Sequence, residues 1–529
     1  MSANEISRRD LLKRSSLLAV PALLGAEAAE AAAAVPAAPR VGAEVYTSIG
    51  VRPLINARGT YTIISGSRML PEVRAAMDAA ARHYVHLDEL ADAIGARLAE
   101  LTKAEWGLVT SGCAAALTHA TAACVAGGNP DLHVRIPDLR GFPRDEAVIP
   151  KHSRNVYDAA VRATGVRVIE VTTVAELEAA LGPRTALVYI LAGPEAEAGP
   201  LTTRAICDVA KGRSVPVLVD AAAEVLTVPN VHLQNGATLV AYSGGKCLRG
   251  PQSAGMLLGR KDLVRAAWVH SAPHHGFSRA MKVGKEEAMG MLTAVEMWAK
   301  RDHAGEWAQW TSWLDAIATR VKALDGVRTV VEQPEGLSNK TPSLQILWDP
   351  KRFGITGPRA ARHLLDGDPR VAVFPAEVKG ESETGLSVTP YMLAAGEEKI
   401  VADKIHALLS SPPRSAEPAA ATSPGADLTG QWEVRIEYAA GVSSHTLHLM
   451  QHGSHLEGSH QGDFVSRDLT GSVEGKEVRV ASNYPESHGD ALTYNFSGQV
   501  AGEEMSGTLE MGEYRAARWT AKRRVHGKT

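Results

Sequence analysis

The stretch VAYSGGKCLRGPQ at residues 240–252 places Lys246 in a glycine-rich turn that directly follows an apolar run. Upstream, VPVLVD at residues 215–220 is a second apolar run with the pattern of a buried strand, and it ends in Asp220. Similar short runs at 167–171 and 186–191 alternate with helical stretches. This alternation predicts an α/β fold whose mostly parallel sheet is covered on both faces by helices.

Lys246 and Asp220 together predict the chemistry of pyridoxal 5'-phosphate (PLP). PLP needs a lysine amine that holds it as a Schiff base, and a carboxylate that keeps its pyridine nitrogen protonated. We assign Lys246 as the lysine that forms the aldimine and Asp220 as the carboxylate that contacts the ring nitrogen. Each residue alone has an ordinary explanation, a solvated loop lysine or a strand-end turn residue, so the pair is more specific than either member.

The cofactor phosphate is assigned to the turn TSGCAAA at residues 110–116, which follows an apolar run and opens a helix. Ser111, Gly112 and Cys113 offer backbone N–H groups and a hydroxyl at a helix N-terminus, where anions bind. A Ser-Gly helix cap without a ligand is the commoner case, but the downstream lysine and aspartate favour the cofactor site. Ser243 is a further candidate for a phosphate contact.

Other candidates are a second catalytic residue and a set of cations. His152 is a candidate for stacking on the pyridine ring or for proton transfer, with a structural role as the alternative. A substrate carboxylate or a phosphate would favour arginine, which binds carboxylates through two parallel hydrogen bonds. For each cation the alternative is a solvated surface charge. The candidate cations are Arg58, Arg249, Arg279 and Lys282.

Composition excludes several classes of function. The chain of 529 residues has a net charge of −3, which gives no sign of a nucleic-acid partner. Its four cysteines have no CxxC spacing, so neither a zinc site nor a disulfide framework is expected. Five C-terminal histidines fit no standard zinc pattern, and His445 and His448 would face opposite sides of a strand. No metal site is therefore predicted.

Segment composition predicts the organisation of the chain. Residues 1–38 carry a twin-arginine pattern at Arg8 and Arg9 and an apolar stretch too short to span a bilayer. We expect a cleaved export signal, a periplasmic protein and no stable membrane anchor. The remaining predicted segments are an N-terminal arm with a cofactor-binding domain (39–290), a long helix with a small α+β domain (291–410), a Pro/Ala/Ser-rich linker (411–427), and an antiparallel β domain, either barrel or sandwich (428–529).

Together these motifs resemble the branch of fold-type I PLP enzymes that contains seryl-tRNA selenium transferase and D-glucosaminate-6-phosphate ammonia-lyase. The resemblance covers about residues 44–410, and the sequence around Lys246 is its strongest part. The other matching stretches are LINARGT (54–60), VTSG (109–112), KHSRN (151–155), VLVDAA (217–222) and RAMKVGK (279–285). The resemblance implies a Schiff base at Lys246, a pyridinium partner at Asp220, and a homodimer or larger homo-oligomer.

Departures from the family narrow the expected reaction. Selenium transferases carry an acid just before the lysine, where this chain has Gly245, and the predicted export signal disfavours a tRNA substrate. Our leading hypothesis is a lyase that acts on a small amino acid or amino-sugar acid by β-elimination with release of ammonia. Aminotransferase and racemase activities stay open because they share the same carbanion. The alternative of another class is a non-catalytic envelope binding protein on a PLP-enzyme scaffold.

Overall fold

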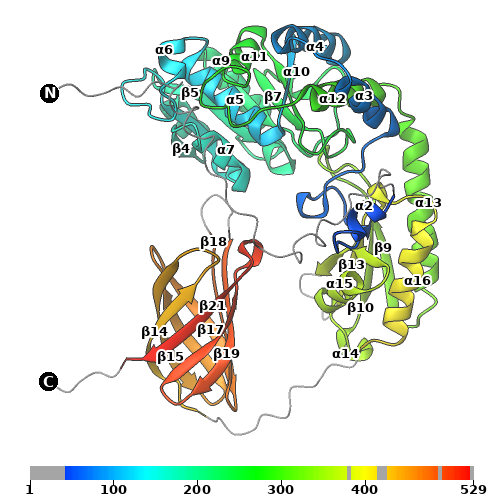
Figure 1. The fold of residues 1–529 in the computed structure, drawn as a ribbon, viewed down its shortest axis with the longest axis vertical. Coiled ribbons are helices and arrows are strands. Elements are labelled where there is room, and N and C mark those ends of the chain that lie inside the picture. Colours follow the sequence, from blue (N-terminus) through cyan, green and yellow to red (C-terminus); the bar gives the residue numbers. More distant parts are fainter. Residues whose placement is uncertain (1–41, 378–382, 414–425, 486–490, 525–529) are drawn as a thin grey trace, which may run out of the picture. The chain divides into compact units, whose positions relative to one another are not determined.

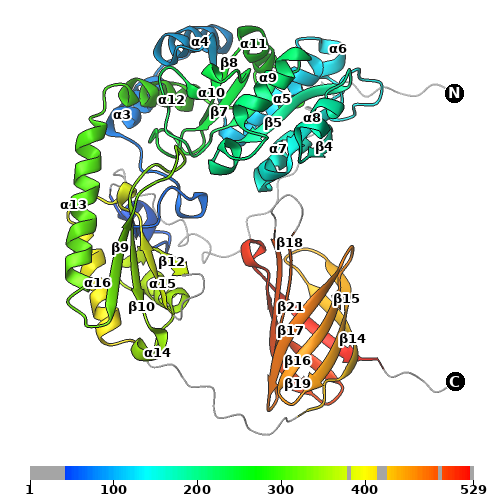
Figure 2. The ribbon, with the colours of Figure 1, turned by 180° about the vertical axis from the view of Figure 1, so that it is seen from behind.

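The computed structural model describes residues 42–377, 383–413, 426–485 and 491–524 (Figures 1 and 2). Within these ranges, the residues up to Pro53 belong to one unit, which contains the short helix α2 (Glu44–Thr47), and the residues from Leu54 onward belong to another. The predicted export signal lies outside the described residues, and so does most of the predicted linker. No helix in the described ranges is long and apolar enough to cross a membrane.

The large sheet of the second unit has seven strands in the order β2-β8-β7-β6-β5-β3-β4. β8 runs antiparallel to both of its neighbours, whereas the other pairs are parallel, which confirms the predicted mostly parallel sheet. The strands are β2 (Trp106–Thr110), β3 (Glu146–Pro150), β4 (Arg167–Val171), β5 (Thr185–Leu191), β6 (Val217–Asp220), β7 (Leu239–Ser243) and β8 (Gly255–Gly259).

Helices cover both faces of this sheet, as its apolar strands require. In β6, Val217 and Val219 belong to one hydrophobic core while Leu218 belongs to the other, because successive side chains point to opposite faces. The first core also receives residues of α3 (Pro71–Ala81), α4 (Leu87–Thr102), α9 (Thr203–Gly212) and α12 (Lys285–Trp298), and the second receives residues of α5 (Cys113–Ala126) and α11 (Lys261–Val269). Short helices complete the connections: α6 (Pro130–His133), α7 (Ala159–Arg162), α8 (Val174–Ala180) and α10 (Val231–Gln234).

Two fully buried histidines in this region make stability depend on pH. Burial lowers the pKa of His119, on α5, and of His270 to about 4 each. Between pH 6.5 and 4 the unfolded chain therefore binds protons that the folded chain does not, and the free energy of unfolding falls as pH falls. Replacing His119 by leucine should flatten this loss by about 1–3 kcal/mol, measured by urea denaturation at pH 7 and pH 5. The same replacement at the exposed His448 is the matched control, because that side chain lies outside the buried core.

A smaller α+β layer follows in the chain. Its antiparallel sheet has the order β12-β13-β10-β9 and shares a core with three helices. Beside it, β1 (Leu54–Asn56) pairs in parallel with β11 (Arg370–Ala372). The elements are β9 (Val327–Glu332), β10 (Ser343–Trp348), β12 (Phe374–Glu377), β13 (Thr384–Val388), α13 (His303–Val321), α14 (Pro350–Phe353), α15 (Gly357–Asp366) and α16 (Glu397–Ser410).

The C-terminal β domain is a closed eight-stranded antiparallel barrel in which β21 pairs with β14 (Figure 1). It confirms the predicted antiparallel domain and selects the barrel over the sandwich. Trp432, Val434 and Ile436 point inward and alternate with more exposed residues, the pattern that a barrel wall requires. The strands are β14 (Gly430–Glu437), β15 (Val442–His452), β16 (His455–Gln461), β17 (Ser466–Glu474), β18 (Glu477–Pro485), β19 (Ala491–Ala501), β20 (Glu504–Glu510) and β21 (Ala516–Arg523).

Candidate active site

Asp220 ends β6 in the middle of the large sheet and is only 2% exposed. Its Oδ1 accepts hydrogen bonds from the backbone N–H of Ala222 (3.1 Å) and from the Cys113 thiol (3.5 Å). Its Oδ2 accepts one from the Tyr189 hydroxyl (3.0 Å). Burial raises the pKa of Asp220 in spite of these bonds, because the carboxylate has lost its contact with water. A cation in contact with Asp220 would therefore stabilise the carboxylate strongly.

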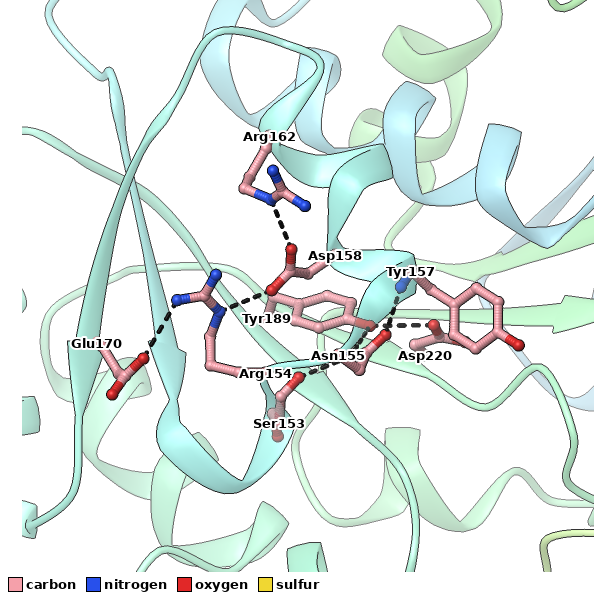
Figure 3. Close-up of polar contacts among 9 residues, drawn as sticks. All are labelled: Ser153, Arg154, Asn155, Tyr157, Asp158, Arg162, Glu170, Tyr189 and Asp220. Atoms are coloured by element: carbon pink, nitrogen blue, oxygen red, sulfur yellow. Dashed lines mark hydrogen bonds and ion pairs between the residues drawn. The ribbon is translucent and has the colours of Figure 1, made fainter. Parts of the chain in front are cut away.

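The hydrogen bond between Tyr189 and Asp220 belongs to a chain of contacts that starts at Asn155 and sets its direction (Figure 3). The side-chain oxygen of Asn155 accepts from the backbone N–H of Tyr157 (2.8 Å), so its amide group points the other way and donates to the Tyr189 hydroxyl (3.1 Å). Tyr189, which receives that bond, directs its own proton to Asp220. This arrangement stabilises Asp220 as a carboxylate.

An ion-pair network holds the segment that carries Asn155 (Figure 3). Asp158 has no exposed surface, and its two oxygens accept from Arg154 (2.7 Å) and Arg162 (2.6 Å). Arg154 also contacts Glu170 on β4 (3.2 Å). Because a buried carboxylate paired with two guanidinium groups is costly to disrupt, the network keeps Asn155 aimed at Tyr189.

Replacing Tyr189 by phenylalanine removes one hydrogen bond to the Asp220 carboxylate. The pKa of Asp220 should rise further, and turnover should fall about tenfold, the effect of one lost bond to a charged group. Steady-state kinetics would measure the fall in turnover, and a titration with PLP would measure the dissociation constant of the cofactor. The Tyr157→Phe variant is the matched control: Tyr157 is largely exposed and contributes only its backbone N–H, so this variant should behave as the parent chain. Equal effects of the two changes would contradict the assigned role of Tyr189.

The predicted phosphate turn connects β2 to α5, next to Asp220. Gly112 has a φ of +94°, and a Cβ on Gly255 would lie 2.3 Å from the carbonyl carbon of Gly112, so β8 closely approaches the turn. The Ser111 hydroxyl donates to the Met281 carbonyl (2.9 Å), which brings the turn to the segment that contains the candidates Arg279 and Lys282. Both of these cations are exposed.

Lys246 lies in the turn after β7, whose last residue is Ser243. Its charge acts on both Asp220 and Cys113, and its ammonium group makes no hydrogen bond or ion pair with the residues that the structure describes. The flanking glycines serve packing within the chain. A Cβ on Gly244 would meet backbone oxygens at 2.9 Å, and one on Gly245 would lie 2.7 Å from the Cα of Gln252. Gly244 and Gly245 are therefore required by close packing within the turn.

The remaining candidates lie in different surroundings. His152 contacts the Leu201 carbonyl (3.1 Å) and the Ser153 hydroxyl (3.1 Å) through its two ring nitrogens, which favours stacking over proton transfer. Arg58 lies over the rings of Phe374 (4.2 Å) and Tyr61 (5.1 Å), and its Nε is buried without a hydrogen bond. Arg249 donates to the Arg68 carbonyl (3.0 Å), and burial lowers its pKa.

Sequence reasoning missed Tyr189 and Asn155. A usable signal existed for Tyr189: its hydroxyl lies within a mostly apolar and mostly buried strand, and a buried tyrosine hydroxyl normally needs a partner. Asn155 lies within the KHSRN stretch but is separated from Tyr189 by 34 positions, so only the fold reveals their contact.

The residues present fit PLP. A buried carboxylate whose described partners are all neutral groups matches a protonated pyridine nitrogen, and the charge of Lys246 reaches that carboxylate. The turn before α5 offers backbone N–H groups at the start of a long helix, which suits a phosphate.

Comparisons with known proteins agree with this geometry. No family model matches the chain. A 5'-C-glycyluridine monooxygenase-decarboxylase of Streptomyces is 32% identical over 380 residues, which cover 69% of this chain and 92% of that enzyme. The chain belongs to the fold-type I PLP-dependent enzymes. Its branch is the one predicted from the motifs, that of D-glucosaminate-6-phosphate ammonia-lyase and the seryl-tRNA selenium transferases.

Within these PLP-dependent enzymes, the ammonia-lyase matches at the level of both sequence and structure. The D-glucosaminate-6-phosphate ammonia-lyase of Salmonella typhimurium is 28% identical over 371 residues, which cover 68% of this chain and 96% of that enzyme. A solved structure of a D-glucosaminate-6-phosphate ammonia-lyase superposes with a TM-score of 0.62, covering 69% of this chain and 98% of the other at 27% identity. Both matches leave about a third of this chain uncovered.

Proposed function

We propose that this PLP-dependent enzyme is a lyase that removes a β-substituent and then ammonia from a small amino acid or amino-sugar acid. The similarity to an ammonia-lyase along almost the whole length of that enzyme, in sequence and in structure, carries the proposal. Beyond the cofactor itself, the reaction needs an α-proton acceptor and a residue that holds the ring nitrogen, and the site offers a candidate for each.

The chain's own groups divide these tasks. Lys246 would hold the cofactor through its Nζ, and the same Nζ, when free, would accept the α-proton of the substrate. Asp220 keeps the ring nitrogen protonated, while Tyr189 and Asn155 hold Asp220 in place. Ser111, Gly112, Cys113 and Ser243 are proposed for the phosphate. Bound PLP supplies the sink for the electron pair left by the departing proton. The proposed contacts of the substrate's acidic group are Arg58, Arg249, Arg279 and Lys282, with His152 stacked on the ring.

The test is a screen of the PLP-loaded chain for ammonia and keto-acid release from amino acids and amino-sugar acids, with and without phosphate groups. Equal amounts of ammonia and keto acid from one substrate would support the lyase. Transfer of the amine to an added keto acid would favour an aminotransferase instead. Loss of optical activity without ammonia would favour a racemase.

A second candidate is oxidative decarboxylation. It is favoured by the higher identity, 32%, to a monooxygenase-decarboxylase. The same screen run with an oxygen electrode separates the two reactions, because the lyase works without oxygen. Oxygen consumption matched by carbon dioxide release would replace the lyase proposal.

We also propose that the chain is exported through its twin-arginine segment and works in the periplasm as a homodimer or larger homo-oligomer. The segment at residues 1–38 and the family resemblance support this. A fusion of residues 1–45 to a reporter that is active only after export tests the signal, with Arg8 and Arg9 changed to lysine as the control. Light scattering of the purified chain tests the assembly.

A further inference from the structure

One end of the barrel interior is polar. The buried rings of His445 on β15 and His460 on β16 are joined through Nδ1 and Nε2 at 2.8 Å. The chain of contacts continues from His445 to Ser443 (3.1 Å) and from His460 to the buried Ser482 (3.0 Å). These groups satisfy one another, and burial lowers the pKa of His460 to about 3, so the pair is neutral at pH 7.

Arg467 on β17 lies beside this polar chain, directly opposite His460 in the strand register. It is 7% exposed, and its guanidinium lies over the rings of Tyr494 (4.6 Å) and Tyr484 (5.9 Å). Its Nε and Nη1 are buried with no hydrogen-bond partner, and the described residues supply no ion pair to this side chain. A buried charge without a counter-charge is costly, and ring contacts replace only part of its lost hydration.

The loop between β16 and β17 lies against this guanidinium. A Cβ on Gly462 would lie 3.4 Å from Nη1 of Arg467 and 3.6 Å from the His445 ring, which is ordinary van der Waals contact, so Gly462 lies beside both groups. The neighbouring Asp463 is half exposed, and its carboxylate is 3.5 Å from His445 Nε2. Among the residues that the structure describes, the acid at this polar end, Asp463, therefore contacts the histidine and not the arginine.

We propose that this end of the barrel binds the carboxylate of a small organic acid, with Arg467 as its anchor and the ring of Tyr494 beside it. A planar guanidinium matches a planar carboxylate through paired N–H donors, and because the two histidines are neutral, Arg467 is the cation that would anchor it. Small closed barrels of eight strands can hold one small ligand at their mouths. The proposal does not depend on the PLP site, because every residue it uses lies within residues 443–494.

The test uses the PLP-loaded full chain and titrates it with a series of monocarboxylates from acetate to hexanoate, with benzoate and inorganic phosphate, followed by ligand-observed NMR and by calorimetry. We expect at least one monocarboxylate to bind with a dissociation constant below about 1 mM. The Arg467→Gln variant should weaken that binding at least about tenfold, because it removes the charged donor. Binding at the PLP site is common to both proteins and cancels in the difference.

Two further variants keep the test decisive if Arg467→Gln does not fold. Arg467→Lys should keep the charge but lose the paired donors, and so bind several-fold more weakly. Asp463→Asn should bind several-fold more tightly, because it removes a negative charge near the site. Binding that is unchanged in these variants, or no Arg467-dependent binding of any monocarboxylate, would overturn the proposal. Arg467-dependent binding of phosphate alone would overturn the assignment of a carboxylate.

Discussion

The Lys246→Ala variant is expected to lose the visible absorption band of the PLP-bound protein and at least about 10³-fold in turnover. The Lys246 amine is the proposed attachment point of the cofactor and also the proposed acceptor of the α-proton, so one substitution removes two functions. The backbone around it should persist, since the turn is held by bonds from Gly244 to Ala254 (2.8 Å) and from Gly250 to Gly244 (2.8 Å).

The absorption spectrum and substrate turnover, recorded together, would check this expectation. Lys211→Ala is the matched control: that lysine is exposed at the end of α9, and the variant should keep both band and activity. A band of full strength in the Lys246→Ala protein would mean that another lysine carries the cofactor, or that none does.

The Asp220→Asn variant is expected to bind PLP but to lose about 10²–10³-fold in turnover. Asparagine keeps the shape of the side chain, yet it removes the charge that holds the ring nitrogen protonated, so the electron sink weakens. The amide also replaces one carboxylate oxygen by an NH2 group, which then faces either the Tyr189 hydroxyl or the Ala222 N–H, both of which now donate to Asp220.

Kinetics of Asp220→Asn and Tyr189→Phe, measured side by side, should give a graded series, with the larger loss for the removed carboxylate. Cofactor content, measured after alkaline release of PLP, separates poor binding from poor chemistry. Turnover of Asp220→Asn at the parent level would show that Asp220 does not hold the ring nitrogen, and that its burial serves packing alone.

The principal site residues could be predicted because local patterns reveal them. A buried strand that ends in an acid is visible as VPVLVD, and the same apolar periodicity reveals most of the strands around it. The position of Lys246 in a turn after β7 follows from its glycines, even though Gly244 and Gly245 turned out to face protein backbone.

Contacts across the fold could not be predicted. Asn155 reaches Tyr189 only because β3 and β5 are neighbours in the sheet, and that strand order is not written in local periodicity. In the barrel, alternation predicted that His445 and His448 face opposite sides, and the structure confirms this, with His445 buried and His448 exposed. The pairing of His445 with His460 depends on the register of β15 and β16, which the sequence leaves open.

The most direct test of the central claim is borohydride reduction of the PLP-loaded chain, followed by proteolysis and mass spectrometry. Reduction makes the link between lysine and cofactor permanent, so the modified peptide identifies the attachment site. We expect one pyridoxyl phosphate group, located on Lys246 in the peptide that contains YSGGK. Modification of a different lysine, or an unmodified peptide from a fully loaded protein, would contradict the assignment of this site.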